Sequence, residues 1–275
     1  MYFKYDLKIG FKKTIPWFLI VAAIVVMTSV ELNLRIHIEE KEGLELLRST
    51  NSMDYFLHVF AGLKPFNLMG NDKFQLPITW FLINMILFYF TGKYPYSEIY
   101  NNHGANVLMR GGSRNKWFLS KWMWSLLCVL IYYFVAYIFV LLFCFIAQVP
   151  ISFKAQQMDY KDMLSPMIDC TMLDTVELMI LPIISSMAAV SVQLLISLIL
   201  KPLLGFAFMA VLYISSAYYF TPFLIGNCSM LARNSVFYIG GITFRQTVII
   251  SLIMMAVSLI IGLFVFYRQD IMGRK

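Results

Sequence analysis

The amino-acid sequence predicts an all-α integral membrane protein, a single domain over residues 1–275 with six transmembrane helices and cytoplasmic termini. Hydrophobic residues make up 60% of the chain and charged residues 13%, which excludes an ordinary soluble domain. The apolar residues gather in runs of about 18 or more, the length that crosses a hydrocarbon core of roughly 30 Å. Lys and Arg concentrate beside alternate ends of these runs, as the positive-inside rule describes.

Residues 1–13 predict a basic amphipathic helix that lies in the inner surface of the membrane. Its apolar residues recur at every fourth position, and so do its lysines. One stripe can therefore face hydrocarbon while the other faces anionic headgroups. The alternative is a frayed basic tail that only sets orientation. The residues expected at the membrane surface are Lys4, Lys8, Lys12 and Lys13.

The six spans are expected at residues 14–30, 74–92, 122–147, 177–200, 203–220 and 245–267. A basic start before an apolar run also describes a signal peptide, but no small-x-small cleavage site follows, so we interpret the first run as a retained span. The acidic segments 31–73 and 148–176 are placed outside the cell, and whether residues 51–66 dip back toward the bilayer stays open. All five tryptophans are expected near span ends, as in an aromatic belt.

The charge count fixes the predicted orientation. In this topology the inner segments hold 13 Lys and Arg against three acids, and the outer segments hold nine against twelve acids. The bias places both termini in the cytoplasm. The formal net charge of +7 therefore reflects topology, and we expect no nucleic-acid partner.

The span interiors contain almost no ionisable residues, and no Ser/His/Asp or paired-acid constellation can be assembled at membrane depth. Ion-coupled carriers and intramembrane enzymes usually need such groups there. No phosphate-cradling GxxxxGK[ST] loop and no metal-ligand spacing occurs. We therefore expect no catalysis, no metal and no bound cofactor, and Gln193 is expected to bridge helices. Cys170 and Cys228 fall in outer segments, where they either pair or stay unpaired.

Residues 94–121 form a polar, basic island between two apolar runs. Glu98 is its only acid. Helical turns are expected from Ser97 to Leu108, followed by a Gly111-Gly112 break and a new helix that begins near Ser113. A cytoplasmic loop with this much order is a place for a soluble partner to bind.

This layout resembles the bacterial type-2 ABC transporter permeases. In their loop between the second and third spans, an acid and a glycine precede a Ser-Arg pair and a Lys; Glu98, Gly104, Ser113, Arg114 and Lys121 match that pattern. The resemblance implies a coupling helix that docks on a separate ABC ATPase, which binds ATP and Mg²⁺. Residues 221–244 are similar to the family's re-entrant outer hairpin. The expected coupling residues are Glu98, Gly104, Arg110, Gly111, Ser113, Arg114, Lys116 and Lys121.

The resemblance implies the multi-pass permease subunit of an ATP-driven exporter in a bacterial plasma membrane. Two ATPase copies and a second permease chain, identical or a sister, would complete it, and membrane lipid would surround it. The cargo class would be a peptide, a lipid-like molecule or a drug-like amphiphile, and the Lys-, Ile- and Asn-rich composition suggests antimicrobial peptides. The alternative is a non-transport binding protein, such as an immunity or sensor protein. An integral membrane enzyme is disfavoured by the missing buried acids and histidines.

Overall fold

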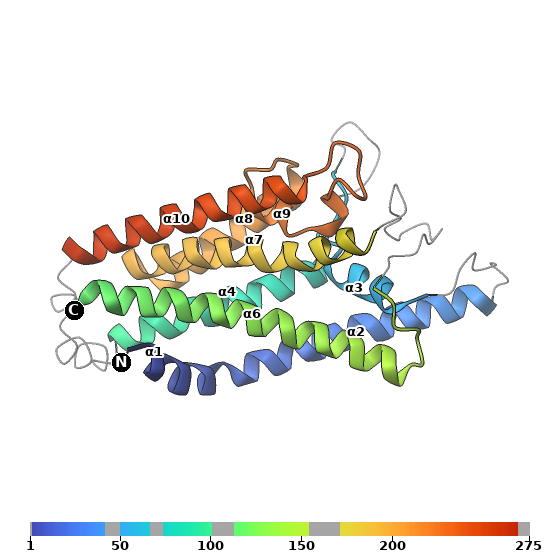
Figure 1. The fold of residues 1–275 in the computed structure, drawn as a ribbon, viewed down its shortest axis with the longest axis horizontal. Helices are drawn as coiled ribbons and strands as arrows, with labels where there is room; N and C mark the ends of the chain where they lie inside the picture. The colour runs from blue at the N-terminus through green and yellow to red at the C-terminus, as the bar shows by residue number, and fades with distance from the viewer. Residues whose placement is uncertain (1, 42–49, 67–73, 101–112, 154–170, 269–275) are drawn as a thin grey trace.

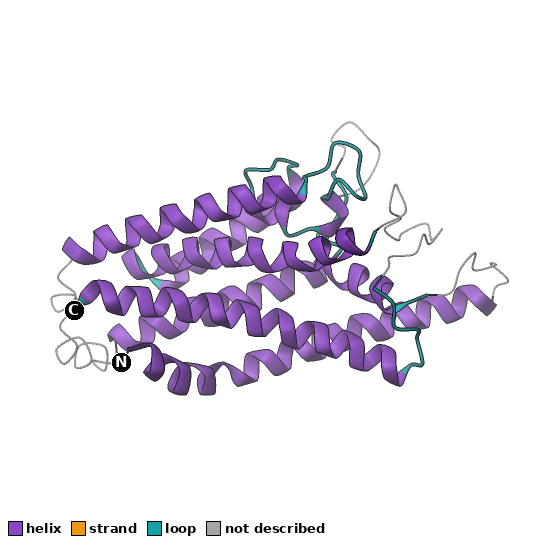
Figure 2. Cartoon of the chain, viewed as in Figure 1, coloured by secondary structure: helices purple, strands orange, loops and turns teal. Residues whose placement is uncertain are grey.

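The computed structural model describes residues 2–41, 50–66, 74–100, 113–153 and 171–268, and these residues are mainly helical, with no named strand among them. The long helices run alongside one another, roughly along the longest axis of the molecule (Figures 1 and 2). The first helix begins and the last helix ends at the same end of this bundle, which we call the terminal end (Figure 1). The other end is called the opposite end.

One unbroken helical stretch opens the chain. It consists of α1 (Tyr2–Tyr5), a π-helical segment η1 (Asp6–Gly10) and α2 (Phe11–Lys41). The predicted surface helix over residues 1–13 and the predicted span over residues 14–30 thus belong to one helical stretch, which continues beyond residue 30. Residues 31–41 extend the helix because they contain no Gly or Pro. The exposed Arg35 side chain also pairs with Glu31 one turn earlier, at 3.0 Å.

Five further long helices occupy the positions of the remaining predicted spans. Their bounds are α4 (Ile78–Tyr100), α6 (Arg114–Ile146), α7 (Met172–Ile199), α8 (Pro202–Tyr218) and α10 (Phe244–Arg268). Local signals set several of their starts. The Ser113 hydroxyl caps α6, Thr171 and Asp174 form a capping box at α7, and α8 begins with a proline at its first position. The helices are confirmed, with ends that shift by up to eight residues at the start of α6 and the end of α4.

Four helices are long and apolar enough to cross a membrane, at residues 2–38, 114–146, 172–199 and 244–267. The chain is therefore a multi-pass membrane protein by length and composition. The other two long helices are weaker candidates, since α4 carries Asn84 and Lys93 and α8 has only 17 residues. Both nevertheless pack within the bundle, where α7 contacts α4, α6, α8 and α10.

Polar and small side chains join the helices in the middle of the bundle. The Gln193 amide of α7 donates to the Phe88 carbonyl oxygen of α4 at 2.6 Å, which confirms its predicted bridging role. The hydroxyls of Tyr133 on α6 and Ser186 on α7 lie 2.7 Å apart. At Gly205 a Cβ would collide with the Ser197 hydroxyl and lie 3.1 Å from the Ser197 backbone nitrogen, so glycine lets α8 approach α7 closely.

Short helices close the opposite end. Nearly every residue of α3 (Ser52–Phe60) is buried, and this helix contacts α2, α4 and α6. The described part of residues 51–66 is therefore packed into the bundle. Residues 219–243 fold back as α9 (Ile225–Cys228), the 3-10 turn η2 (Leu231–Arg233) and a series of turns.

Candidate functional site

A cluster of buried polar and charged side chains lies near the terminal end, and we call it the buried charged junction. It consists of Asp6 from η1, Tyr94 and Glu98 from α4, and Ser120 and Lys121 from α6. All five residues are at most 6% exposed. The junction therefore joins three helical segments that are far apart in the sequence.

Lys121 is the centre of the junction. Its ammonium group forms ion pairs with the carboxylates of Asp6 and Glu98. The Ser120 hydroxyl donates to Asp6 Oδ2 at 2.5 Å. The Tyr94 hydroxyl lies 2.9 Å from Asp6 Oδ1 and 2.6 Å from Glu98 Oε1, so its single proton is shared between the two carboxylates.

Aromatic rings enclose the junction. The Lys121 ammonium lies 4.9 Å from the Tyr94 ring centroid and 5.4 Å from that of Trp117, within the range of cation–π attraction. Trp124 packs on Tyr94 with ring centroids 4.3 Å apart. A Cβ at Gly10 would collide with the Trp124 indole, so this glycine lets η1 lie directly against α6. The rings exclude water and strengthen the ion pairs.

The ion pairs of the buried charged junction are suited to holding helical segments together. Buried ion pairs gain little net stability, because desolvation offsets their attraction, but removing one partner leaves a charge that the interior cannot solvate. Lys121 faces two carboxylates, so it cannot leave either of them without that cost. The N-terminal helix, the end of α4 and the start of α6 are thereby held together.

Two of the eight predicted coupling residues, Glu98 and Lys121, lie in this junction. Glu98 was expected to pair with a base on another protein, whereas the structure pairs it with Lys121 of its own chain. Ser113 caps α6, Arg114 is the first residue of that helix, and Lys116 is exposed. The other three predicted residues, Gly104, Arg110 and Gly111, lie outside the described residues, as does the predicted coupling helix except for its entry from α4.

The lysines expected at the membrane surface are exposed. Lys4, Lys8, Lys12 and Lys13 all lie on the outer face of the N-terminal helical stretch. Asp6, Gly10 and Thr14 are buried on its inner face, so this helix packs against the bundle through one stripe and presents its lysines on another.

Sequence reasoning missed Asp6, Tyr94 and Ser120. A signal for Asp6 existed, because Asp6, Gly10 and Thr14 recur every four residues on the face away from the lysines. The aromatic-belt interpretation is wrong for three tryptophans, since Trp80, Trp117 and Trp124 are at most 3% exposed. Trp80 donates to the Ser229 hydroxyl at 3.0 Å, and the other two enclose the junction.

A second buried cation, Arg233 of η2, organises the opposite end. We call Arg233 and its acceptors the arginine hub. The guanidinium donates to the carbonyl oxygens of Leu63, Ser216 and Ala217 and to the side-chain oxygen of Asn227. No carboxylate among the described residues pairs with it. Burial lowers the pKa of Arg233 to about 10, so it remains a cation at neutral pH.

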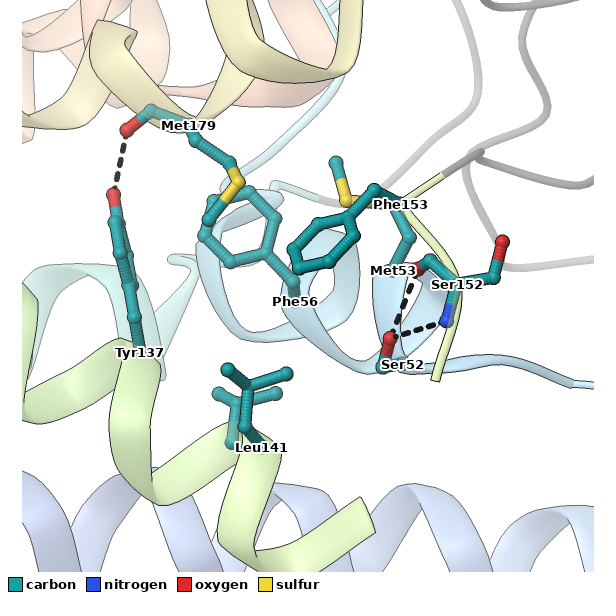
Figure 3. Close-up of a pocket in the computed structure, with 9 residues that line it drawn as sticks. Ser52, Met53, Phe56, Tyr137, Leu141, Ser152, Phe153 and Met179 are labelled. Atoms are coloured by element: carbon teal, nitrogen blue, oxygen red, sulfur yellow. Dashed lines mark hydrogen bonds between the residues drawn. The ribbon is translucent and has the colours of Figure 1, made fainter. Parts of the chain in front are cut away.

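A small cavity lies beside α3, between α6, α7 and the chain that follows α6 (Figure 3). Phe56, Phe153 and Met179 face it, and its volume of about 20 Å³ has room for one water molecule. The polar groups on its wall bond within the protein: Ser52 bonds to the backbone of Ser152, and Tyr137 donates to the Met179 carbonyl at 2.7 Å.

Asp54, also on α3, is 5% exposed. Its carboxylate accepts the Asn51 backbone N–H at 2.8 Å as part of a capping box. Burial nevertheless raises the pKa of Asp54 to about 7, because this hydrogen bond only partly offsets the loss of solvation.

No group of three or more metal-ligating side chains comes together within the described residues. Cys228 is buried and free, and Cys170 lies outside the described residues, so the predicted alternative of a disulfide between them stays untested. Comparison with protein-family models, with curated proteins and with solved structures gives no match for this chain.

Proposed function

We propose that this chain is the permease subunit of an ATP-driven exporter, powered by a separate ATPase that binds ATP and Mg²⁺. The observation that carries this proposal is the buried charged junction. Residues 99–112 begin directly after Glu98 and end directly before Ser113, the cap of α6. Lys121 lies two turns into α6, and the side chains of Glu98 and Lys121 pair with each other. A partner that gripped this segment would act on α4, α6 and the N-terminal helix together.

The distribution of charge supports the same proposal. The terminal end exposes lysines, and this supports a cytoplasmic position for it, where a soluble ATPase could reach it. The buried charges of the described residues lie toward the two ends of the bundle, and the bridging groups between them, such as Gln193 and Ser186, are neutral. A helix bundle of this kind has little with which to couple transport to ions, and it needs energy from outside.

The coupling role proposed for Glu98 changes in the light of its intramolecular pairing. Glu98, Lys121 and Asp6 are proposed to transmit force within the chain, while contact with the ATPase falls to residues 99–112 and to exposed side chains such as Lys116. A second permease chain, identical or a sister, would complete the exporter. The cargo is proposed to be an amphiphilic peptide, lipid-like molecule or drug-like molecule.

The test is co-purification of the tagged chain with a co-expressed ATPase encoded beside its gene. Lys116→Glu reverses an exposed charge in the first turn of α6, whereas Lys64→Glu makes the same change on the exposed Lys64 beyond α3. We expect the wild type and Lys64→Glu to retain the ATPase. Lys116→Glu should weaken retention by about fivefold or more, because a contact charge is typically worth about 1 kcal/mol or more.

Two further measurements test whether the ATPase, and not this chain, hydrolyses ATP. The purified chain alone should hydrolyse no ATP, and the complex should hydrolyse it. If the wild type retains no ATPase, or if the isolated chain hydrolyses ATP after rigorous purification, the proposed function is wrong.

A further inference from the structure

Aromatic side chains of α2, α4 and α8 lie next to one another where α4 contacts α2 on one side and α8 on the other, and we call Trp17, Tyr89 and Phe206 the aromatic strip. The rings of Trp17 on α2 and Tyr89 on α4 have centroids 4.9 Å apart. Phe206 of α8 meets the other side of Tyr89 at 6.3 Å. Tyr89 is 40% exposed, so these rings form a surface that an external molecule can touch.

Lysines lie next to this aromatic strip on the side of the terminal end. Lys93 lies one turn from Tyr89, and its ammonium donates to the Tyr89 hydroxyl at 3.1 Å. The ammonium of Lys13 lies 5.8 Å from the ring centroid of Tyr94, the residue that follows Lys93. Both lysines are exposed, and neither has a carboxylate partner among the described residues.

The acids that lie nearest are turned inward. Asp6 and Glu98 are both buried and bound to Lys121 in the junction. Within the described residues, the exposed charged side chains next to the aromatic strip are therefore positively charged. A ligand that binds here gains by carrying negative charge.

The three helices show the same order of side chains when followed inward from the terminal end. On α2 the order is Lys13, Trp17 and the exposed Ile20; on α4 it is Lys93, Tyr89 and the exposed Leu82. Beside α8 the order is the exposed Lys201, which is its N-cap, then Phe206 and, two turns further along, the exposed Ile214. Cation, interfacial ring and apolar side chain follow one another as headgroup, interface and hydrocarbon do in a leaflet.

We propose that the aromatic strip and the lysines beside it form a binding site for an anionic phospholipid of the surrounding bilayer. Lys13 and Lys93 hold the phosphodiester oxygens, Tyr89 and Trp17 lie at the level of the glycerol, and the acyl chains run along the exposed apolar residues of α2 and α8. The apolar stripe identifies a lipid and not free phosphate as the ligand. This inference does not depend on the proposed transport function.

The test measures lipid retention by native mass spectrometry of the whole chain, after exchange into detergent with phosphatidylglycerol or phosphatidylcholine. The variants are Lys13→Gln and Lys93→Gln, and the control is Lys64→Gln, which removes an exposed lysine four residues beyond the end of α3. We expect the wild type and the control to prefer phosphatidylglycerol. Lys13→Gln and Lys93→Gln should each bind phosphatidylglycerol about fivefold more weakly, because a lysine near an anionic surface contributes about 1 kcal/mol to binding.

Further arms distinguish the sources of the negative charge. Lys93→Arg should retain the preference, because it keeps the charge, and inorganic phosphate at millimolar concentration should not displace phosphatidylglycerol. Equal retention of the two lipids by the wild type would overturn the proposal. An equal loss of phosphatidylglycerol binding in Lys64→Gln would also overturn the proposal, and so would displacement of the lipid by inorganic phosphate. Either result would remove the need for a lipid site at the aromatic strip.

Discussion

The two ends of the bundle each contain a buried cation, but they satisfy it in different ways. At the opposite end, Arg233 donates to backbone carbonyls at the end of α8 and beyond α3. At the terminal end, Lys121 is held by two carboxylates on two other helical segments. Backbone carbonyls are fixed dipoles that belong to the fold. Carboxylates are side chains that can rotate, take up a proton or pair elsewhere.

The two sets of interactions therefore differ in how easily they can rearrange. The arginine hub satisfies carbonyl groups that the end of a helix leaves without partners, so breaking it exposes backbone groups as well as a charge. Breaking the buried charged junction exposes side-chain charges only, and these can find other partners if the helices move. Rearrangement of the helices should therefore cost less free energy at the terminal end than at the opposite end, and residues 99–112 connect to the terminal end.

The largest expected effect follows from Lys121→Met, which leaves Asp6 and Glu98 buried without their counter-charge. We expect a loss of about 3–5 kcal/mol in the free energy of unfolding, measured by denaturant or thermal unfolding in detergent. Replacing all three together, as Asp6→Asn, Glu98→Gln and Lys121→Met, should recover most of the loss because no charge remains. A triple variant as unstable as the single one would show that the pairing is not what matters.

Arg233→Lys tests the other cation and should cost about 3 kcal/mol. Lysine keeps the charge but offers no planar fork, so it cannot donate to Leu63 and to the end of α8 at the same time. Arg35→Lys is the matched control, because Arg35 forms an exposed pair with Glu31 and should change stability by less than about 0.5 kcal/mol. If Arg233→Lys and Arg35→Lys unfold at the same temperature, the arginine hub does not stabilise the fold.

The smallest effect concerns Asp54 and depends on pH. Its folded-state pKa of about 7 lies above the unfolded value of about 3.9, so the folded chain binds more protons between these values. The free energy of unfolding should therefore fall as the pH rises, by about 2–3 kcal/mol between pH 5 and pH 7.5. Asp54→Asn should remove this slope and Glu31→Gln, an exposed acid on α2, should keep it; a slope unchanged in Asp54→Asn would refute the assignment.

Much of the fold could be predicted from the sequence. Apolar runs and local start signals, such as Ser113 and the Thr171–Asp174 capping box, placed the six long helices within a few turns. The first span was expected to end at residue 30, before a polar outer segment, whereas the helix continues to Lys41 because nothing in residues 31–41 breaks it. Polarity alone does not end a helix that projects from the bundle.

The site was predicted less well. Glu98 and Lys121 were expected to contact another protein, and the structure instead pairs them with each other, because their partners depend on which helices become neighbours. Asp6 lies 115 residues from Lys121 in the sequence, and no local pattern joins them. Arg233 was counted only as an external charge for the same reason, since its acceptors are carbonyl groups that every sequence contains.

The helical stretch from Tyr2 to Lys41 has a mechanical consequence. Forty residues at 1.5 Å each give a rod about 60 Å long, roughly twice the thickness of the hydrocarbon core. One end carries Asp6 of the junction, and near the other end Asn33 accepts a hydrogen bond from Tyr55 of α3 at 2.9 Å. If the rod pivots at the junction by about 5°, its far end moves by about 5 Å. A rearrangement too small to break the packing around Lys121 would thus become a displacement of one helical turn on the other side of the membrane.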